Sequence, residues 1–128
     1  MDVSFQDIIL EKGIYHALAE LYTSLALNQE KQNNIEKCNE YYQKKLENLE
    51  NEYSILKKIR ETSGKRDDKE AELDNIKHQL EVYLKIAENN FKLKNYEGCI
   101  KNLEEVIDRS SVDSTNVNKK LIKFKIRI

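Results

Sequence analysis

Two long segments with the same apolar spacing flank one glycine, and this pattern limits the possible fold more than any other feature. In the segment before Gly64, apolar or small residues recur three or four positions apart, at Ile35, Cys38, Tyr42, Leu46, Leu49, Tyr53, Leu56 and Ile59. The segment after Gly64 has the same spacing at Leu73, Ile76, Leu80, Tyr83, Leu84, Ala87 and Phe91. Such spacing gives an α-helix one apolar stripe and leaves its charged residues facing solvent.

Two helices of this kind can bury their stripes against each other as an antiparallel hairpin. If the chain reverses at Gly64, the two segments meet in a defined register. This register predicts that Leu49 lies near Leu80 and that Cys38 lies close to Phe91. We therefore expect a long central hairpin that spans about residues 30–94.

The composition favours an all-α fold. The 128 residues include no Pro and only three Gly, while 35% of them are charged. Turn-forming residues and β-branched runs are scarce, which suits long helices and disfavours sheets. A chain of this length forms one domain or a part of one. We predict a single helical-repeat domain over residues 1–128, built from antiparallel helical hairpins.

Two short helices are expected before the hairpin, within about residues 5–27. Ser4 can cap the first, and Gly13 can end it in the left-handed conformation. The second helix carries an apolar face formed by Ile14, Leu18, Leu21, Tyr22 and Leu25. Because it is more apolar than the long helices, we expect it nearer the core, with Asn28 capping the helix that follows.

After the hairpin, residues 96–108 have the apolar spacing of a further helix, and the polar stretch to Asn116 is expected to be a loop. Residues 116–128 fit either a helix or a strand. Their apolar residues, which include Leu121, Phe124, Ile126 and Ile128, partly follow helical spacing and partly alternate. We favour a terminal helix, because nothing else in the chain offers a strand a partner.

The charge balance and the cysteines limit the classes of partner and compartment. The net charge is −1, which gives no electrostatic reason to expect nucleic acid or acidic lipid. No run of 18 apolar residues predicts a membrane span, and the first residues lack the pattern of a secretory signal. Cys38 and Cys99 lack CxxC spacing and are interpreted as reduced, small apolar residues. We expect a cytoplasmic or nuclear protein.

The sequence contains no motif that predicts catalysis. Phosphate-binding loops, zinc-protease motifs and nucleophile elbows are all missing. His16 and His78 lie far apart on charged or mixed helices, where a packing or surface role is typical. We therefore expect no catalytic residue, cofactor, metal ion or small-molecule substrate.

Residues 83–107 carry the order Tyr-Leu-Lys-Ile-Ala-Glu-Asn-Asn-Phe-Lys-Leu-Lys-Asn-Tyr-Glu-Gly-Cys-Ile-Lys-Asn-Leu-Glu-Glu-Val-Ile, which resembles a tetratricopeptide-type helix pair. Ala87 stands where such repeats place a small residue, and Phe91 and Tyr96 supply the aromatic residues. Lys94-Asn95 replaces the Gly-Asp that is usual at the turn. This resemblance implies a tetratricopeptide-like, right-handed helical stack.

The wider order of helices, from Gly13 to Ile128, is similar to the N-terminal helical region of the proteasome lid non-ATPase subunit 7 and COP signalosome first-subunit family. In that family a C-terminal PCI module follows, and the sequence contains none. The resemblance implies a non-catalytic scaffold subunit of the 26S proteasome regulatory particle lid, which supports ubiquitin-dependent protein degradation. Its partners would be other protein subunits of the lid or the base.

The interface for such a partner is expected on apolar residues near the two ends of the chain. These residues are Phe5, Ile8, Ile9, Leu121, Phe124, Ile126 and Ile128. The basic residues between the last four could suggest nucleic acid, but so much apolar surface favours packing on protein. The chain's own helix at 96–108 could also cover that tail.

Two other functions are open. The chain could be a stand-alone tetratricopeptide adaptor that binds a peptide through Lys85, Asn89, Asn90 and Lys92. It could also be a coiled-coil protein whose long helices associate between chains.

Overall fold

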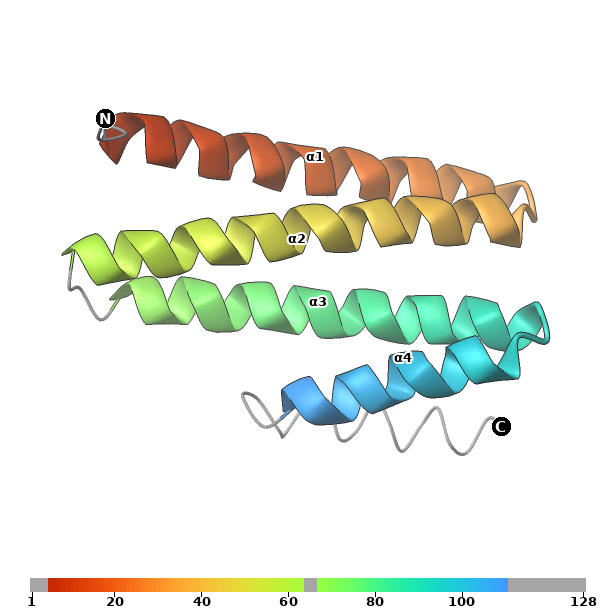
Figure 1. Cartoon of the computed structure of the whole chain (residues 1–128). Coiled ribbons are helices and arrows are strands. Elements are labelled where there is room, and N and C mark those ends of the chain that lie inside the picture. The colour runs from red at the N-terminus through yellow and green to blue at the C-terminus, as the bar shows by residue number, and fades with distance from the viewer. Residues whose placement is uncertain (1–4, 64–66, 111–128) are drawn as a thin grey trace.

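The computed structural model describes residues 5–63 and 67–110. These residues form four helices, α1 (Phe5–Lys31), α2 (Ile35–Ser63), α3 (Asp67–Lys92) and α4 (Tyr96–Arg109), and the described ranges contain no strand. Figure 1 shows the helices side by side in chain order, each running opposite to the one before it. The predicted all-α class is confirmed.

The central hairpin of α2 and α3 is present in the predicted register. Its ladder of polar contacts places residue 39 beside residue 90 and residue 49 beside residue 75, because Asn39 Nδ2 donates to Asn90 Oδ1 at 3.1 Å and Asn75 Nδ2 donates to the Leu49 carbonyl at 3.0 Å. Leu49 also shares the buried core with Leu80. Packing between consecutive helices, α1 on α2, α2 on α3 and α3 on α4, builds this core.

One predicted contact of the hairpin differs. Cys38 Sγ lies 3.6 Å from Asn89 Nδ2, which donates to it. Phe91 is instead partly exposed, and its ring meets the Tyr96 ring edge-on at 5.7 Å between centroids. Phe91 lies in the last turn of α3, where the aromatic ring of the following helix is its nearest aromatic neighbour.

The two short helices expected before the hairpin are one continuous helix, so the predicted end at Gly13 is wrong. Gly13 lies in the interior of α1, and a Cβ added there would meet nothing within 4 Å. An interior glycine costs a helix only about 1 kcal/mol relative to alanine. Packing along the 27 residues of α1 against α2 outweighs this cost.

The expectation that residues 14–27 lie nearer the core is also wrong. This part of the chain belongs to α1, which is the outermost helix on its side of the layer and packs mainly on α2 (Figure 1). Its fully buried side chains are the small residues Ala19 and Ala26. Small residues let two helices approach closely, so α1 reaches the core mainly through its alanines, while most of its large aliphatic side chains are exposed.

The hairpin begins later than predicted, because α1 continues through Asn28 to Lys31. Asn33 then takes the left-handed conformation, with φ at 58°, and the Asn34 N–H donates to the Gln29 carbonyl at 2.9 Å. Asn34 rather than Asn28 caps α2, since its Oδ1 accepts from the Lys37 N–H at 3.2 Å. Two consecutive asparagines therefore end one helix and start the next.

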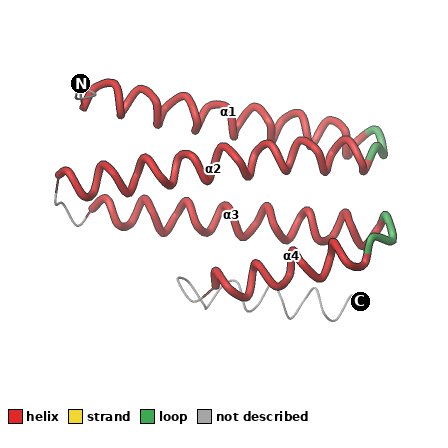
Figure 2. The backbone as a smooth tube through the Cα atoms, viewed as in Figure 1, coloured by secondary structure: helices red, strands yellow, loops and turns green. Residues whose placement is uncertain are grey.

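The connection between α3 and α4 has the same structure (Figure 2, green). Lys94 takes φ of 63°, and the Asn95 N–H donates to the Asn90 carbonyl at 2.8 Å. Asn95 Oδ1 then accepts from the Gly98 N–H at 3.2 Å and caps α4. The bounds of α4 agree with the predicted helix at 96–108.

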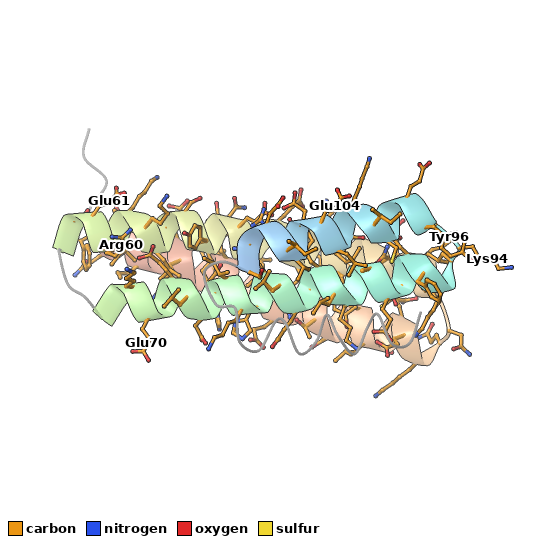
Figure 3. The ribbon with its side chains drawn as sticks, turned by 90° about the horizontal axis from the view of Figure 1, so that it is seen from below. Arg60, Glu61, Glu70, Lys94, Tyr96 and Glu104 are labelled. Atoms are coloured by element: carbon orange, nitrogen blue, oxygen red, sulfur yellow. The ribbon has the colours of Figure 1, made fainter. Side chains whose placement is uncertain are left out.

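The predicted polar loop up to Asn116, from residue 111 on, and the predicted terminal helix at 116–128 lie outside the described residues. Figure 3 places Arg60 of α2 and Glu70 of α3 at one end of the layer. Lys94 and Tyr96 lie at the opposite end, where both tight turns occur.

Candidate protein-interaction surface

The side of α1 that faces away from α2 carries a continuous apolar stripe. Its members are spaced three or four residues apart and occupy positions opposite the buried alanines of α1; they are Leu10, Ile14, Ala17, Leu21 and Leu25. Leu10 is 64% exposed, Leu21 is 61% exposed and Ile14 is 52% exposed. We call these five residues the outer stripe of α1.

The inner side of α1 is already occupied. Ala19 and Ala26 belong to the core, and the Tyr22 ring stacks on Tyr41 of α2 with 6.1 Å between centroids. A soluble helix that packs on one neighbour normally has one apolar face. This helix has two, and only one of them is covered in the described structure. The outer stripe is therefore the candidate docking surface.

A second apolar stripe lies on α4, on the side away from α3. Tyr96, Ile100 and Ile107 are each more than half exposed, and the half-buried Leu103 lies between them. We call these four residues the outer stripe of α4. The two stripes are on the first and the last described helix, so they lie at the two lateral edges of the layer of described helices (Figure 1).

The predicted interface residues are only partly described. Phe5 and Ile9 are exposed, at 48% and 40%, whereas Ile8 is half-buried on the inner side of α1. The remaining four, Leu121, Phe124, Ile126 and Ile128, lie outside the described residues. The structure adds the larger stripe further along α1, because Ile14, Leu21 and Leu25 point outward.

The sequence did contain a signal for this stripe. The predicted apolar face correctly joined Ile14, Leu21 and Leu25. It wrongly included Tyr22, which stacks on Tyr41 of α2, and it was assigned to the core. The spacing from Leu10 to Ile14 continues the same face across Gly13, which is typical of one uninterrupted helix. On its other side, α1 carries the small, buried residues Ala19 and Ala26. Two separate faces on one helix indicate two neighbours.

A chain of polar contacts crosses all four helices beneath these surfaces. His16 Nδ1 of α1 lies 2.9 Å from Glu52 Oε2 of α2, and Glu52 Oε1 accepts from Asn75 Nδ2 of α3 at 2.7 Å. Asn75 Oδ1 accepts from Gln79 Nε2 at 2.7 Å, and Gln79 Oε1 accepts from Arg109 Nη1 of α4. Buried polar groups need such partners, so this network fixes the relative positions of the helices.

A shorter ladder of asparagines lies nearer the tight turns. Asn39 of α2 donates to Asn90 of α3, and Asn90 Nδ2 donates to Asn102 Oδ1 of α4 at 2.8 Å. Asn89 is likewise buried and donates to Cys38 Sγ. Both Asn89 and Asn90, two of the side chains considered for peptide binding, thus bond within the fold.

Burial favours the neutral form of three core side chains, Cys38, Cys99 and Tyr42. Burial raises the pKa of the Cys38 thiol and of the Cys99 thiol, which disfavours the reactive thiolate. Burial also raises the pKa of Tyr42 to about 12. These side chains are suited to packing rather than to nucleophilic chemistry.

The described residues contain neither a group of side chains for a metal ion nor a helix that could span a membrane. Among the described residues, no three His, Cys, Asp or Glu side chains gather in a way that could hold a metal ion. None of the helices in 5–63 and 67–110 has an apolar stretch of the length that crossing a bilayer requires.

Comparison with models of known protein families, with curated proteins and with solved structures gives no match.

Proposed function

We propose that this chain is a non-catalytic helical scaffold that joins other proteins through the outer face of α1. The observation that carries the proposal is the outer stripe of α1, with Leu10 and Leu21 each more than 60% exposed. Fully burying a leucine side chain contributes roughly 2 kcal/mol, so an uncovered row of such residues favours association. Within the described residues, this is the largest row of exposed aliphatic side chains on one helix face.

The mechanism of a scaffold is positional. The polar chain from His16 to Arg109 links all four helices, and the two tight turns have the same left-handed geometry. Such a layer holds its two outer stripes at a fixed distance and orientation. A protein bound at one end is therefore placed relative to a protein bound at the other.

The resemblance over Gly13 to Ile128 supports a more specific assignment. We propose that the scaffold is a tetratricopeptide-like subunit of the proteasome regulatory particle lid and serves ubiquitin-dependent protein degradation in the cytoplasm or nucleus. Its partners would be helical subunits of the lid or the base, and it would carry no cofactor.

The test is purification of the tagged full chain from its own cells, with quantitative mass spectrometry of the bound proteins. Leu21→Arg places a charge in the outer stripe, whereas Leu27→Arg makes the same change at an exposed leucine of α1 outside the stripe. Lid subunits are expected in fixed proportion with the unmodified chain and with Leu27→Arg. Leu21→Arg should reduce them by about tenfold or more, because an unpaired charge is costly in an apolar interface.

Two results would contradict different parts of the proposal. If both arginine variants retain the same proteins as the unmodified chain, the outer stripe of α1 does not dock partners. If Leu21→Arg loses bound proteins that include no proteasome subunit, docking through α1 stands and the assignment to the lid is wrong.

A further inference from the structure

The two hairpins of the chain are copies of one sequence unit. Residues of the α1–α2 hairpin correspond to residues of the α3–α4 hairpin at one constant spacing of 61 positions (83 − 22 = 61 for Tyr22 and Tyr83). Between residues 22 and 38, seven residues have an identical partner at this spacing: Tyr22 and Tyr83, Ala26 and Ala87, Asn28 and Asn89, Lys31 and Lys92, Asn34 and Asn95, Glu36 and Glu97, and Cys38 and Cys99. Self-similarity at a fixed spacing is the signature of repeat proteins.

The structure confirms that these positions correspond. Asn34 and Asn95 cap the second helix of each hairpin through the same contact, from Oδ1 to an N–H three residues later. Cys38 and Cys99 are both buried, and each lies one turn into that helix. The described chain is thus two consecutive helix–turn–helix units.

The interface between the two units is the contact of α2 with α3. On α3, one stripe makes this contact, since Asn75 bonds Leu49 and Asn89 bonds Cys38. Val82 and Ile86 lie between them on the same stripe, and each is at most 2% exposed.

The same positions in the first unit include three residues of the outer stripe of α1. Asn75, Val82, Ile86 and Asn89 of α3 correspond to Ile14, Leu21, Leu25 and Asn28 of α1, in that order. In α3 these positions are covered by the preceding unit. In α1, Ile14, Leu21 and Leu25 are each at least 40% exposed. Ile14, Leu21 and Leu25 of the outer stripe are therefore positions of a stacking face that the described residues leave uncovered.

The α2 side of the α2–α3 interface corresponds to a face of α4. On α2, Asn39 bonds Asn90 of α3, and Tyr42 and Leu46 continue the same stripe in the core. The corresponding residues of α4 are Ile100, Leu103 and Ile107, with Tyr96 one turn earlier. These are the outer stripe of α4.

We propose that copies of this chain stack head to tail, with the outer stripe of α4 of one copy packed on the outer stripe of α1 of the next. This inference rests on the proposed function of the α1 surface and adds a second occupant: inside a stack the surface binds another copy, and only the end copy presents it to a different protein. The contact would repeat, with matching positions, the half of the α2–α3 interface next to the tight turns, because α4 has 14 residues and α2 has 29. It would also be more apolar on both sides, since Ile14 replaces Asn75 on one side and Ile100 replaces Asn39 on the other.

The geometry sets the kind of assembly. A contact between two different faces of one molecule is heterologous, so it does not close after two copies. Each added copy covers one free stripe and presents another, so the stack always keeps one free stripe at each end. The mean molar mass should therefore increase with protein concentration rather than stop at a dimer.

The experiment is complementation between two variants of the full chain, followed by light scattering coupled to size-exclusion chromatography. Leu21→Arg blocks the α1 stripe and leaves the α4 stripe intact, while Ile100→Arg does the reverse. Both replaced side chains are more than half exposed, so the helices should form as before, and circular dichroism checks this. Leu27→Arg is the matched control on α1.

We expect the unmodified chain and Leu27→Arg to form oligomers whose mass grows with concentration. Each of the two stripe variants alone should be monomeric, and an equal mixture should form a one-to-one dimer, because each supplies the face that the other lacks. Gln29→Cys mixed with Ile100→Cys should give a disulfide-linked pair, since their counterparts Asn90 and Asn39 are in contact at 3.1 Å.

Three results would overturn the inference. A monomeric unmodified chain at high concentration excludes stacking of copies. Self-association of Ile100→Arg at the unmodified strength would mean that α1 pairs with α1 instead. Failure of the mixture to dimerise would mean that the two stripes do not meet. If Leu21→Arg still loses its partners in cells, the proposed function stands whichever of these results is found. If Leu21→Arg keeps its partners, the proposed function fails together with the inference.

Discussion

Asn75 of α3 donates to Glu52 of α2 at 2.7 Å, and both side chains are buried between the two long helices. A second bond from Asn75 to the Leu49 carbonyl and one from Gln79 to Asn75 leave its amide fully engaged. An apolar hairpin could slide by one helical turn and still bury leucines. A buried amide has no such freedom, because each slipped register leaves polar atoms without partners.

Asn75→Ala should therefore lower the free energy of unfolding by about 2 kcal/mol, because it removes a partner from the buried Glu52 carboxylate and from Gln79. Urea unfolding followed by circular dichroism measures the change. Asn51→Ala, at an exposed position of α2, is the matched control and should change stability by less than about 0.5 kcal/mol. Equal effects of the two substitutions would contradict a structural role for the network.

Gly13→Ala should raise the free energy of unfolding by about 0.5–1 kcal/mol, because Gly13 lies inside α1 and a Cβ there meets nothing within 4 Å. Gly98→Ala is the comparison. Its Cβ would lie 2.6 Å from Asn95 Nδ2 and 3.0 Å from Asn90 Nδ2, so it should destabilise the α4 cap. Thermal unfolding of the two variants should give shifts of opposite sign. A lower melting temperature for Gly13→Ala would mean that α1 is broken there.

Lys94→Gly should stabilise the fold by about 1 kcal/mol, since Lys94 holds a positive φ of 63° that glycine adopts without strain. Lys85→Gly makes the same change at an exposed position inside α3 and should cost about 1 kcal/mol. Chemical denaturation of both variants at one pH checks the prediction. A loss of stability in Lys94→Gly would show that the lysine side chain contributes more than its backbone strain costs.

Stability should fall at alkaline pH partly because of Tyr42. Burial raises the pKa of Tyr42 to about 12 from its ordinary value of 10.0. The unfolded chain therefore releases the phenol proton first, so the contribution is complete below about pH 10 and is lost as the pH rises to about 12. A shift of this size corresponds to about 2–3 kcal/mol.

Unfolding by urea at pH 8 and at pH 11.5 tests this pH dependence. Tyr42→Phe should lose less stability between the two pH values than the unmodified chain does. Tyr96→Phe, which changes an exposed ring, should behave as the unmodified chain. Identical pH profiles for Tyr42→Phe and the unmodified chain would contradict the assignment.

Much of the fold could be predicted because it depends on local spacing. The apolar period of three and four residues predicted the two long helices, their antiparallel register and the bounds of α4. The buried amides could not be predicted in the same way. Asn75 and Gln79 look like solvent positions by residue type, and only the contact of α3 with helices on two sides buries them.

The turn at Asn33 shows a second reason why parts of the fold could not be predicted from the sequence. Asn28 and Asn34 are both suitable helix caps, and their local sequences do not decide between them. Packing of α1 on α2 extends α1 as far as Lys31, and this places the left-handed residue at Asn33 and the cap at Asn34. The same geometry recurs at Lys94 and Asn95, where a lysine takes the left-handed position and an asparagine again caps the helix.

The candidate surface, too, was predicted in part from the sequence and decided in part by the packing of the helices. By itself, the sequence determined that Ile14, Leu21 and Leu25 share one face of a helix, because a helical period fixes which residues lie together. Only the tertiary structure decided that this face points outward, since Ala19 and Ala26 on the other side allow the closer approach to α2. Periodicity defines the faces of a helix, and the neighbour that packs on one of them decides which face is left exposed.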